Sequence, residues 1–297
     1  MKREVFKNLI TKFWRFFGPL YNKMIGDNVF AIAGQSAFFL LLSAVPLAMF
    51  AVSVLQGLHF PVDLVESYVK TVLNEESAHQ LADYLTNMAH STMGISVVTI
   101  ICTLWSAAQG IHAMTNGLNR VHNTYENRNW FLLRLRAMLY TVVLFLIIVA
   151  TMLVVVFGKS INRAVSPYLP HLSGFVAFLF HARYVIVFLY MVALFALVYR
   201  NLPNLTRDKR RQYGFRCQLP GALFSAAAWV VLAWAIGIYV DDFNGYSIYG
   251  SLTRVAVVMV WLYFCMVATM LGAEFNFVYH DKIDKYTRKI LPKRKKR

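Results

Sequence analysis

The chain has 297 residues, of which 58% are hydrophobic and 15% are charged, and its mean hydropathy of +0.51 excludes an ordinary soluble domain. Its 30 Lys and Arg residues outnumber its 14 Asp and Glu residues, and a net charge of +16 is typical of proteins that bind nucleic acid or anionic lipid. Cys102, Cys217 and Cys265 lie far apart and form no CxxC pair, so the cysteines indicate neither a disulfide framework nor a zinc site.

Residues 1–28 form a basic segment with an amphipathic pattern. Within Val5–Leu20, apolar side chains recur at helical spacing on one face, and basic side chains lie on the other. This pattern predicts an interfacial helix at an anionic membrane surface, and the alternative is a helix that packs on the rest of the protein. Gly18-Pro19 is expected to end or bend the helix, because proline lacks a backbone N–H and clashes with the preceding turn.

Six apolar stretches in residues 29–280 are long enough to cross a bilayer as helices. The clearest contains Val255–Ala273, nineteen residues without a charge, which extend about 28 Å as a helix against a hydrocarbon core of about 30 Å. Residues 57–91 are polar and acidic and are expected to form short helices outside the bilayer. The six predicted spans are approximately Val29–Leu55, Met93–Leu118, Ala137–Phe157, Phe175–Tyr199, Gln218–Val240 and Gly250–Asn276.

The positions of the basic residues predict the orientation of these spans. Twenty-five of the 30 Lys and Arg residues fall in four segments, which precede span 1, follow spans 2 and 4, and form the tail 281–297. Because Lys and Arg concentrate on the cytoplasmic side of membrane proteins, both termini are expected in the cytoplasm, and an even number of spans agrees. We therefore expect an all-α, polytopic membrane protein with six transmembrane helices. Topology alone explains the charges, so no nucleic acid partner is expected, and the tail is interpreted as a solvated topology determinant.

Polar side chains within the apolar spans mark a candidate cavity or substrate path. Gln109, His112 and Asn116 follow helical spacing on one face of span 2, and a polar stripe on a buried helix faces either a wet cavity or a neighbouring helix. Glu274 lies in span 6 and is expected to pair with His112 or Arg120, either as a functional group or as a structural ion pair. The full candidate set is Gln35, Ser36, Gln109, His112, Asn116, Arg120 and Glu274.

Three further residues lie near the predicted outer membrane boundary. Arg183, Tyr249 and Arg254 are candidates for contact with lipid head groups or with the membrane interface. The alternative for Arg183 is snorkelling to the surface, and for Arg254 it is simple anchoring of a helix end. Neither alternative requires a specific ligand.

The sequence contains no signature of a catalytic site. Its eight histidines form no HxH or HExxH pattern, and GxSxG and P-loop motifs are absent. Glu274 is the single acidic residue inside a predicted span, although metal-dependent hydrolysis needs clustered Asp, Glu or His ligands. We therefore expect no enzymatic activity, no metal and no cofactor.

Several short motifs resemble the YihY/BrkB family of bacterial inner-membrane proteins, once labelled ribonuclease BN. Their order and spacing agree across roughly residues 28–280, although Phe38-Phe39 stands where many relatives carry tyrosine. The motifs are Ser43-Ala-Val-Pro46, Leu118-Asn-Arg-Val121 with Glu126, Tyr199-Arg-Asn-Leu-Pro203, Leu219-Pro-Gly-Ala222, Tyr249-Gly-Ser-Leu252 and Leu271-Gly-Ala-Glu-Phe-Asn276. The resemblance implies a six-helix, multi-pass protein of the bacterial cytoplasmic membrane. It implies no settled activity, but some relatives are linked to envelope lipid handling.

Three functions follow as hypotheses. The first is a transporter or translocator of a lipid or other amphiphilic envelope molecule, with a polar cavity lined by spans 1, 2 and 6. The alternative is a non-transporting scaffold that recruits envelope-assembly partners, and a ribonuclease is the third. The expected partners are membrane lipids, with envelope proteins or a second copy of this chain as further possibilities.

The predicted topology can be tested with reporter fusions. Green fluorescent protein fused after Arg297 should fluoresce, and alkaline phosphatase inserted in residues 57–91 should be active, because the two reporters work on opposite sides of the cytoplasmic membrane. Phosphatase activity from a fusion after Arg297 would contradict the predicted cytoplasmic C-terminus.

Overall fold

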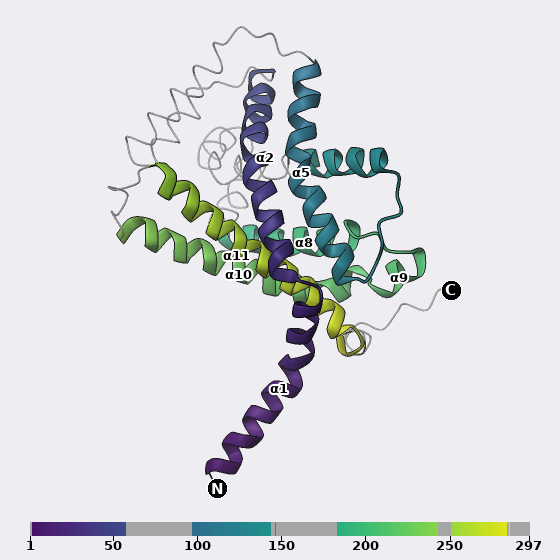
Figure 1. The fold of residues 1–297 in the computed structure, drawn as a ribbon, viewed down its shortest axis with the longest axis vertical. Coiled ribbons are helices and arrows are strands. Elements are labelled where there is room, and N and C mark those ends of the chain that lie inside the picture. The colour runs from purple at the N-terminus through teal and green to yellow at the C-terminus, as the bar shows by residue number, and fades with distance from the viewer. Residues whose placement is uncertain are drawn as a thin grey trace, which may run out of the picture. The chain divides into compact units, whose positions relative to one another are not determined.

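A computed structural model describes residues 2–57, 97–143, 146, 183–242, 251–283 and 285 (Figure 1). All regular secondary structure in these ranges is helical, as the apolar periodicity predicts. Most of predicted span 3, the first part of span 4 and residues 58–91 of the predicted outer loop lie outside the described residues.

The described helices coincide with predicted spans 1, 2, 5 and 6 and with the second part of span 4. Residues 130–143 are also helical and include the start of predicted span 3. The helices are α1 (Lys2–Gly26), α2 (Val29–Gly57), α5 (Val97–Val121), α8 (Arg183–Asn201), α9 (Arg207–Gln212), α10 (Phe215–Asp242) and α11 (Ser251–Val278).

Two of these helices are long and apolar enough to cross a membrane. They are the 25 residues Phe215–Tyr239 of α10 and the 24 residues Val255–Val278 of α11. Within the described ranges a third span is possible if Phe17–Gly26 and Val29–Ala44, which meet at an angle of 60°, count as one broken span. The described part of the chain is thus all-helical and includes helices that could span a membrane, and the total of six spans stays a prediction.

The chain divides into two compact units, which are described separately. Unit 1 comprises Met1–Phe39, His112–Arg128 and Tyr184–Arg297, and unit 2 comprises Leu40–Ile111 and Asn129–Arg183. Helices α2 and α5 each contribute to both units.

The chain turns sharply between α1 and α2. Asn28 has a φ of 54°, and asparagine tolerates this left-handed conformation better than most residues. Its backbone N–H donates to the carbonyl of Ile25 over 3.1 Å, while its own carbonyl accepts from Ile32. Because α1 continues past Pro19 to Gly26, Gly18-Pro19 does not end the helix, and the alternative that it bends the helix stays a prediction. The break between α1 and α2 lies at Asn28.

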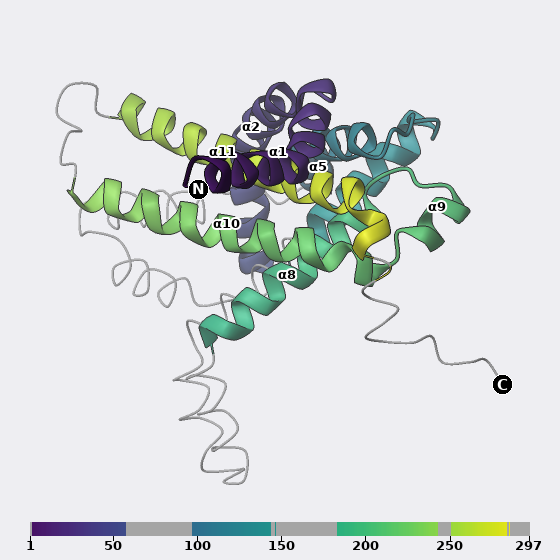
Figure 2. The same cartoon turned by 90° about the horizontal axis from the view of Figure 1, so that it is seen from below.

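Helices α10 and α11 lie side by side along much of their length (Figures 1 and 2). They approach closely at Gly221 and Gly272, where a Cβ atom on either glycine would overlap the backbone of the other helix. The small residues Ala222, Ser225 and Ala226 on α10 are fully buried. Small residues allow helix backbones to approach, and this approach brings polar groups within hydrogen-bonding distance.

A buried hydrogen-bond network joins α8, α10 and α11 around this contact. The Asn276 side chain accepts from the Gly221 backbone N–H over 2.7 Å and donates to the Gln218 carbonyl over 3.0 Å. The Tyr199 hydroxyl of α8 donates to the Thr269 carbonyl over 2.7 Å and lies 2.7 Å from the Ser225 hydroxyl. Each such bond contributes about 1 kcal/mol, so the network fixes the register of the three helices.

Replacing Gly221 with alanine should destabilise the protein. Its Cβ would overlap the Gly272 carbonyl oxygen and lie 2.6 Å from Cγ of Asn276, and overpacking of this kind costs about 1–3 kcal/mol or more. Gly237→Ala in the same helix is the matched control, because no atom lies within 4 Å of its added Cβ. Thermal unfolding in detergent should show a lower midpoint for Gly221→Ala alone. Equal midpoints for the two variants would contradict the close contact.

Candidate functional site

A polar pocket of about 320 Å³ lies between the start of α2 and the end of α5 in unit 1. Asn28 directly precedes α2 and lines the pocket together with Gln35 of that helix, while Asn116 and Arg120 share one face of α5. Ala31, Ile32 and Gly117 complete the lining. The pocket therefore combines three amides and one guanidinium group with a small apolar floor.

Gly117 allows the helices around the pocket to pack closely. A Cβ atom at this position would lie 2.6 Å from the Met270 Cε of α11 and 2.8 Å from the Ile32 Cγ2 of α2. The absence of a side chain thus brings α5 against two other helices of unit 1 at the pocket floor.

Gln35, Asn116 and Arg120 are the predicted cavity residues that line this pocket. His112 lies beside it, with its Nε2 atom 3.4 Å from the Asn116 amide nitrogen. Ser36 is fully buried outside the pocket, and its hydroxyl has no hydrogen-bond partner among the described residues. The helical spacing of the polar stripe therefore correctly grouped Asn116 and Arg120 on one face.

Gln109 has a structural role in unit 2 and does not line the pocket. Its carbonyl oxygen accepts a hydrogen bond from Arg134, whose guanidinium also donates to the Trp105 carbonyl over 2.6 Å. The guanidinium carbon lies 4.8 Å from the centre of the Trp105 ring, which is a cation–π distance. Burial lowers the pKa of Arg134 from its ordinary value. For Gln109, this contact agrees with the alternative that polar side chains of the stripe bond a neighbouring helix.

Glu274 has a different partner from the two that were predicted. Its carboxylate lies 3.9 Å from the Lys23 Nζ of α1, and Lys23 also pairs with Asp27 one turn further on. The expected pairing with His112 or Arg120 is wrong, because the end of α1 occupies this position on α11. Glu274 is completely buried, and neither of its oxygens has a hydrogen-bond donor within 3.5 Å among the described residues.

The contact of α1 with α11 combines this ion pair with an aromatic ring. The Lys23 ammonium lies 4.9 Å from the centre of the Phe277 ring, one turn beyond Glu274. Two carboxylates, from Asp27 and Glu274, thus face one ammonium group. Earlier in α1, Trp14 and Phe17 are exposed, so α1 packs on the protein through its C-terminal end. The interfacial position of the rest of α1 stays a prediction.

The described residues do not show whether Arg183, Tyr249 and Arg254 lie close together. Arg183 is the first residue of α8, and Arg254 lies in the first turn of α11. Their side chains, and Tyr249 as a whole, lie outside the described residues.

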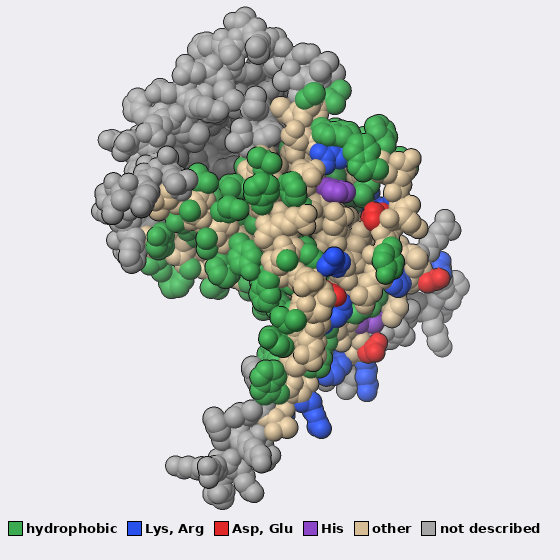
Figure 3. Space-filling view, viewed as in Figure 1, with side chains coloured by type: hydrophobic (Ala, Val, Ile, Leu, Met, Phe, Trp, Pro, Cys, Tyr) green, Lys and Arg blue, Asp and Glu red, His purple; other side chains and the backbone are tan. Residues whose placement is uncertain are grey.

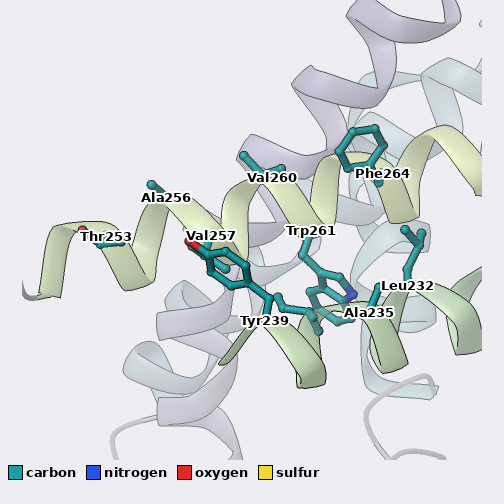
Figure 4. Close-up of a pocket in the computed structure, with 10 residues that line it drawn as sticks. Leu232, Ala235, Tyr239, Thr253, Ala256, Val257, Val260, Trp261 and Phe264 are labelled. Atoms are coloured by element: carbon teal, nitrogen blue, oxygen red, sulfur yellow. The ribbon is translucent and has the colours of Figure 1, made fainter. Parts of the chain in front are cut away.

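A second, apolar pocket of about 460 Å³ lies between α10 and α11. Figure 4 shows Trp261 projecting from α11 toward Leu232 and Ala235 of α10, with Tyr239 and Val257 nearer the helix ends. The surrounding surface of these helices is also apolar: Val231, Trp234 and Val260 are more than half exposed. Figure 3 shows hydrophobic side chains gathered over α10 and α11, as expected for helices that face lipid.

A polar clamp, which sequence analysis did not identify, ties the end of α5 to the segment after α8. Asn119 donates to the Glu126 carboxylate over 2.9 Å and accepts from the Asn204 backbone over 2.6 Å. Arg128 binds both oxygens of Glu126, at 2.6 and 2.5 Å. Burial raises the pKa of Glu126, but the hydrogen bonds from Arg128 and Asn119 outweigh it and lower that pKa below its usual range. Asn119 and Glu126 both belong to the family-like motif Leu118-Asn-Arg-Val121 with Glu126, and this motif was the sequence feature that could have indicated the clamp.

His122, close in sequence to Asn119 of the clamp, belongs to a cluster of aromatic and histidine rings with Tyr213, Phe277 and His280. The ring of His122 is 1% exposed, and its centre lies 5.2 Å from that of Tyr213 and 5.8 Å from that of Phe277. Neither ring nitrogen has a hydrogen-bond partner among the described residues. Burial, followed by the positive charges of Lys209, Lys23 and His280, lowers the pKa of His122 to about 4. Among the described residues, no group of three His, Cys, Asp or Glu side chains could hold a metal ion.

The buried His122 should make the protein sensitive to acid. Because its pKa falls from 6.5 in the unfolded chain to about 4 in the fold, the unfolded state binds more protons between these values. Its contribution to stability is complete above pH 6.5 and is lost as the pH falls toward 4, by about 3 kcal/mol in total. His122→Phe should flatten this part of the pH profile of unfolding in detergent, measured against a baseline at pH 8. Parallel profiles for the variant and the wild type would contradict this assignment.

Comparison with known proteins places the chain in a family. The family description "Virulence factor BrkB" matches residues 20–297. The chain is 27% identical to the putative ribonuclease-like protein YfkH of Bacillus subtilis, over 84% of this chain and 90% of that protein. It is 24% identical to a UPF0761 membrane protein of Alteromonas mediterranea, over 92% of this chain and 90% of that protein. No solved structure matches the chain. With the membrane-spanning helices already described, the match over nearly the whole length shows that the chain is a membrane protein of the BrkB virulence factor family.

Proposed function

We propose that the chain transports a lipid or another amphiphilic envelope molecule across the bacterial cytoplasmic membrane. The observation that carries this proposal is the polar pocket formed by Gln35, Asn116 and Arg120 on helices that are otherwise largely apolar. Polar and charged side chains in membrane helices are costly, and they commonly mark a substrate path.

The pockets of unit 1 match the two parts of an amphiphile. The polar pocket at α2 and α5 suits a head group, and the apolar pocket between α10 and α11 suits a hydrocarbon chain. Few polar side chains line the second pocket, so a polar solute gains little there. An amphiphilic substrate accounts for both surfaces.

The charges at the end of α1 support a coupling role for Glu274. Two carboxylates share one ammonium group, so uptake of a proton or another cation would change the attraction that holds α1 on α11. The group thus offers a link between charge movement and movement of α1, which ends at Gly26, two residues before Asn28 of the polar pocket.

The transport hypothesis can be tested with purified protein in liposomes that contain labelled lipids. The wild type should move label between leaflets faster than empty liposomes. Glu274→Gln should reduce the rate by about tenfold, a typical size for a coupling effect, because it removes the charge that is proposed to link ion uptake to the position of α1. Asp208→Asn, at an exposed position in α9, is the matched control and should keep the wild-type rate.

The alternative of a membrane scaffold predicts a different pattern. A scaffold would show no leaflet exchange above empty liposomes even when folded and supplied with co-purifying envelope proteins. It would tolerate Glu274→Gln but lose its partners when Gly221 is replaced, because only the helix packing would matter. That combination of results would overturn the transport hypothesis.

A further inference from the structure

The polar pocket carries one positive charge and no negative charge in its lining. Arg120 is exposed, and it has no ion-pair partner among the described residues. The other polar lining side chains are the neutral amides of Asn28, Gln35 and Asn116. A guanidinium group surrounded by amides presents mainly hydrogen-bond donors, so an anion is the ligand with the matching chemistry.

The nearby acidic groups do not neutralise Arg120. Asp27 directly precedes Asn28, but its carboxylate pairs with Lys23, which Glu274 also faces. The other titratable neighbour, His112, lies beside Asn116 and adds no negative charge.

The size and surroundings of the pocket suit a head group rather than a whole lipid. Its volume of about 320 Å³ is at the lower end of the range for small-molecule sites. On α2, Phe38 follows the lining residue Gln35 by three positions and is 47% exposed, so an apolar side chain lies within one helical turn of the pocket in unit 1. A ligand with a polar group in the pocket and a hydrocarbon chain beside Phe38 would satisfy both environments.

We propose that this pocket binds the phosphate group of an anionic phospholipid, with the Arg120 guanidinium as its charge partner and the three amides as additional donors. The inference rests on the proposed transport of an amphiphile and specifies its head group. Tetrahedral phosphate presents oxygens in several directions, whereas a carboxylate is planar. Phosphate therefore matches hydrogen-bond donors that approach from two helices better than a carboxylate does.

Binding can be measured without transport, using protein purified in a non-ionic detergent. Fluorescent short-chain phosphatidylglycerol is the probe, and diacylglycerol with the same chains is the comparison lipid without phosphate. Arg120→Gln should weaken phosphatidylglycerol binding by about tenfold or more, as expected for loss of a charge-assisted hydrogen bond. Diacylglycerol binding should not change, and Arg120→Lys should retain part of the affinity because it keeps the charge.

Arg216→Gln is the matched control, since it removes the same charge from an exposed position at the start of α10. Equal weakening by both substitutions would overturn the proposal, because the effect would then be general electrostatic attraction. Competition by inorganic phosphate as effective as competition by unlabelled phosphatidylglycerol would also overturn it, because the ligand would then be a soluble anion. Asn116→Leu provides a second variant at the pocket and should weaken phosphatidylglycerol binding while the thermal midpoint remains unchanged.

The two proposals fail in distinguishable ways. Arg120-dependent binding without leaflet exchange in liposomes would support the phosphate site and contradict transport. Leaflet exchange that is unaffected by Arg120→Gln, together with unchanged binding, would support transport and overturn the phosphate site.

Discussion

The close approach of α10 to α11 at Gly221 and Gly272 is the contact on which the rest of unit 1 depends. In a bilayer, lipid tails are as apolar as leucine, so burial of apolar surface does not by itself drive helices together. Here two glycines remove the side chains that would separate the backbones, and Asn276 then reaches the Gly221 amide. Tyr199 adds α8 to the same network through its hydroxyl group. Polar groups inside the membrane thereby hold the helices together.

Helix α11 also organises the surfaces that we associate with function. Glu274 faces Lys23 at the end of α1, and Met270 packs against Gly117 at the floor of the polar pocket. Tyr263 lies against Gly34 of α2, the helix that supplies the opposite wall. A displacement of α11 would therefore reach the charged contact and the pocket together, because both lie along the second half of one helix.

Much of the fold was predictable because apolar runs report directly which segments meet lipid. Their lengths located α10 and α11 to within a few residues, and helical spacing placed Asn116 and Arg120 on one face. Spacing along one helix does not reveal which other helix lies opposite. For that reason the pairing of Glu274 with Lys23 was missed, and Gln109 was assigned to a cavity although it binds Arg134 from the helical residues 130–143.

The complete enclosure of Glu274 has a consequence for how its charge can change. Because its side chain has no exposed surface in this arrangement, bulk water does not reach the carboxyl group directly. The Lys23 ammonium lies 3.9 Å from this carboxylate, on a side chain that is 18% exposed. In the proposed transport mechanism, a change in the charge of Glu274 would therefore require a rearrangement of its surroundings, and the contact with Lys23 would couple that rearrangement to the position of α1.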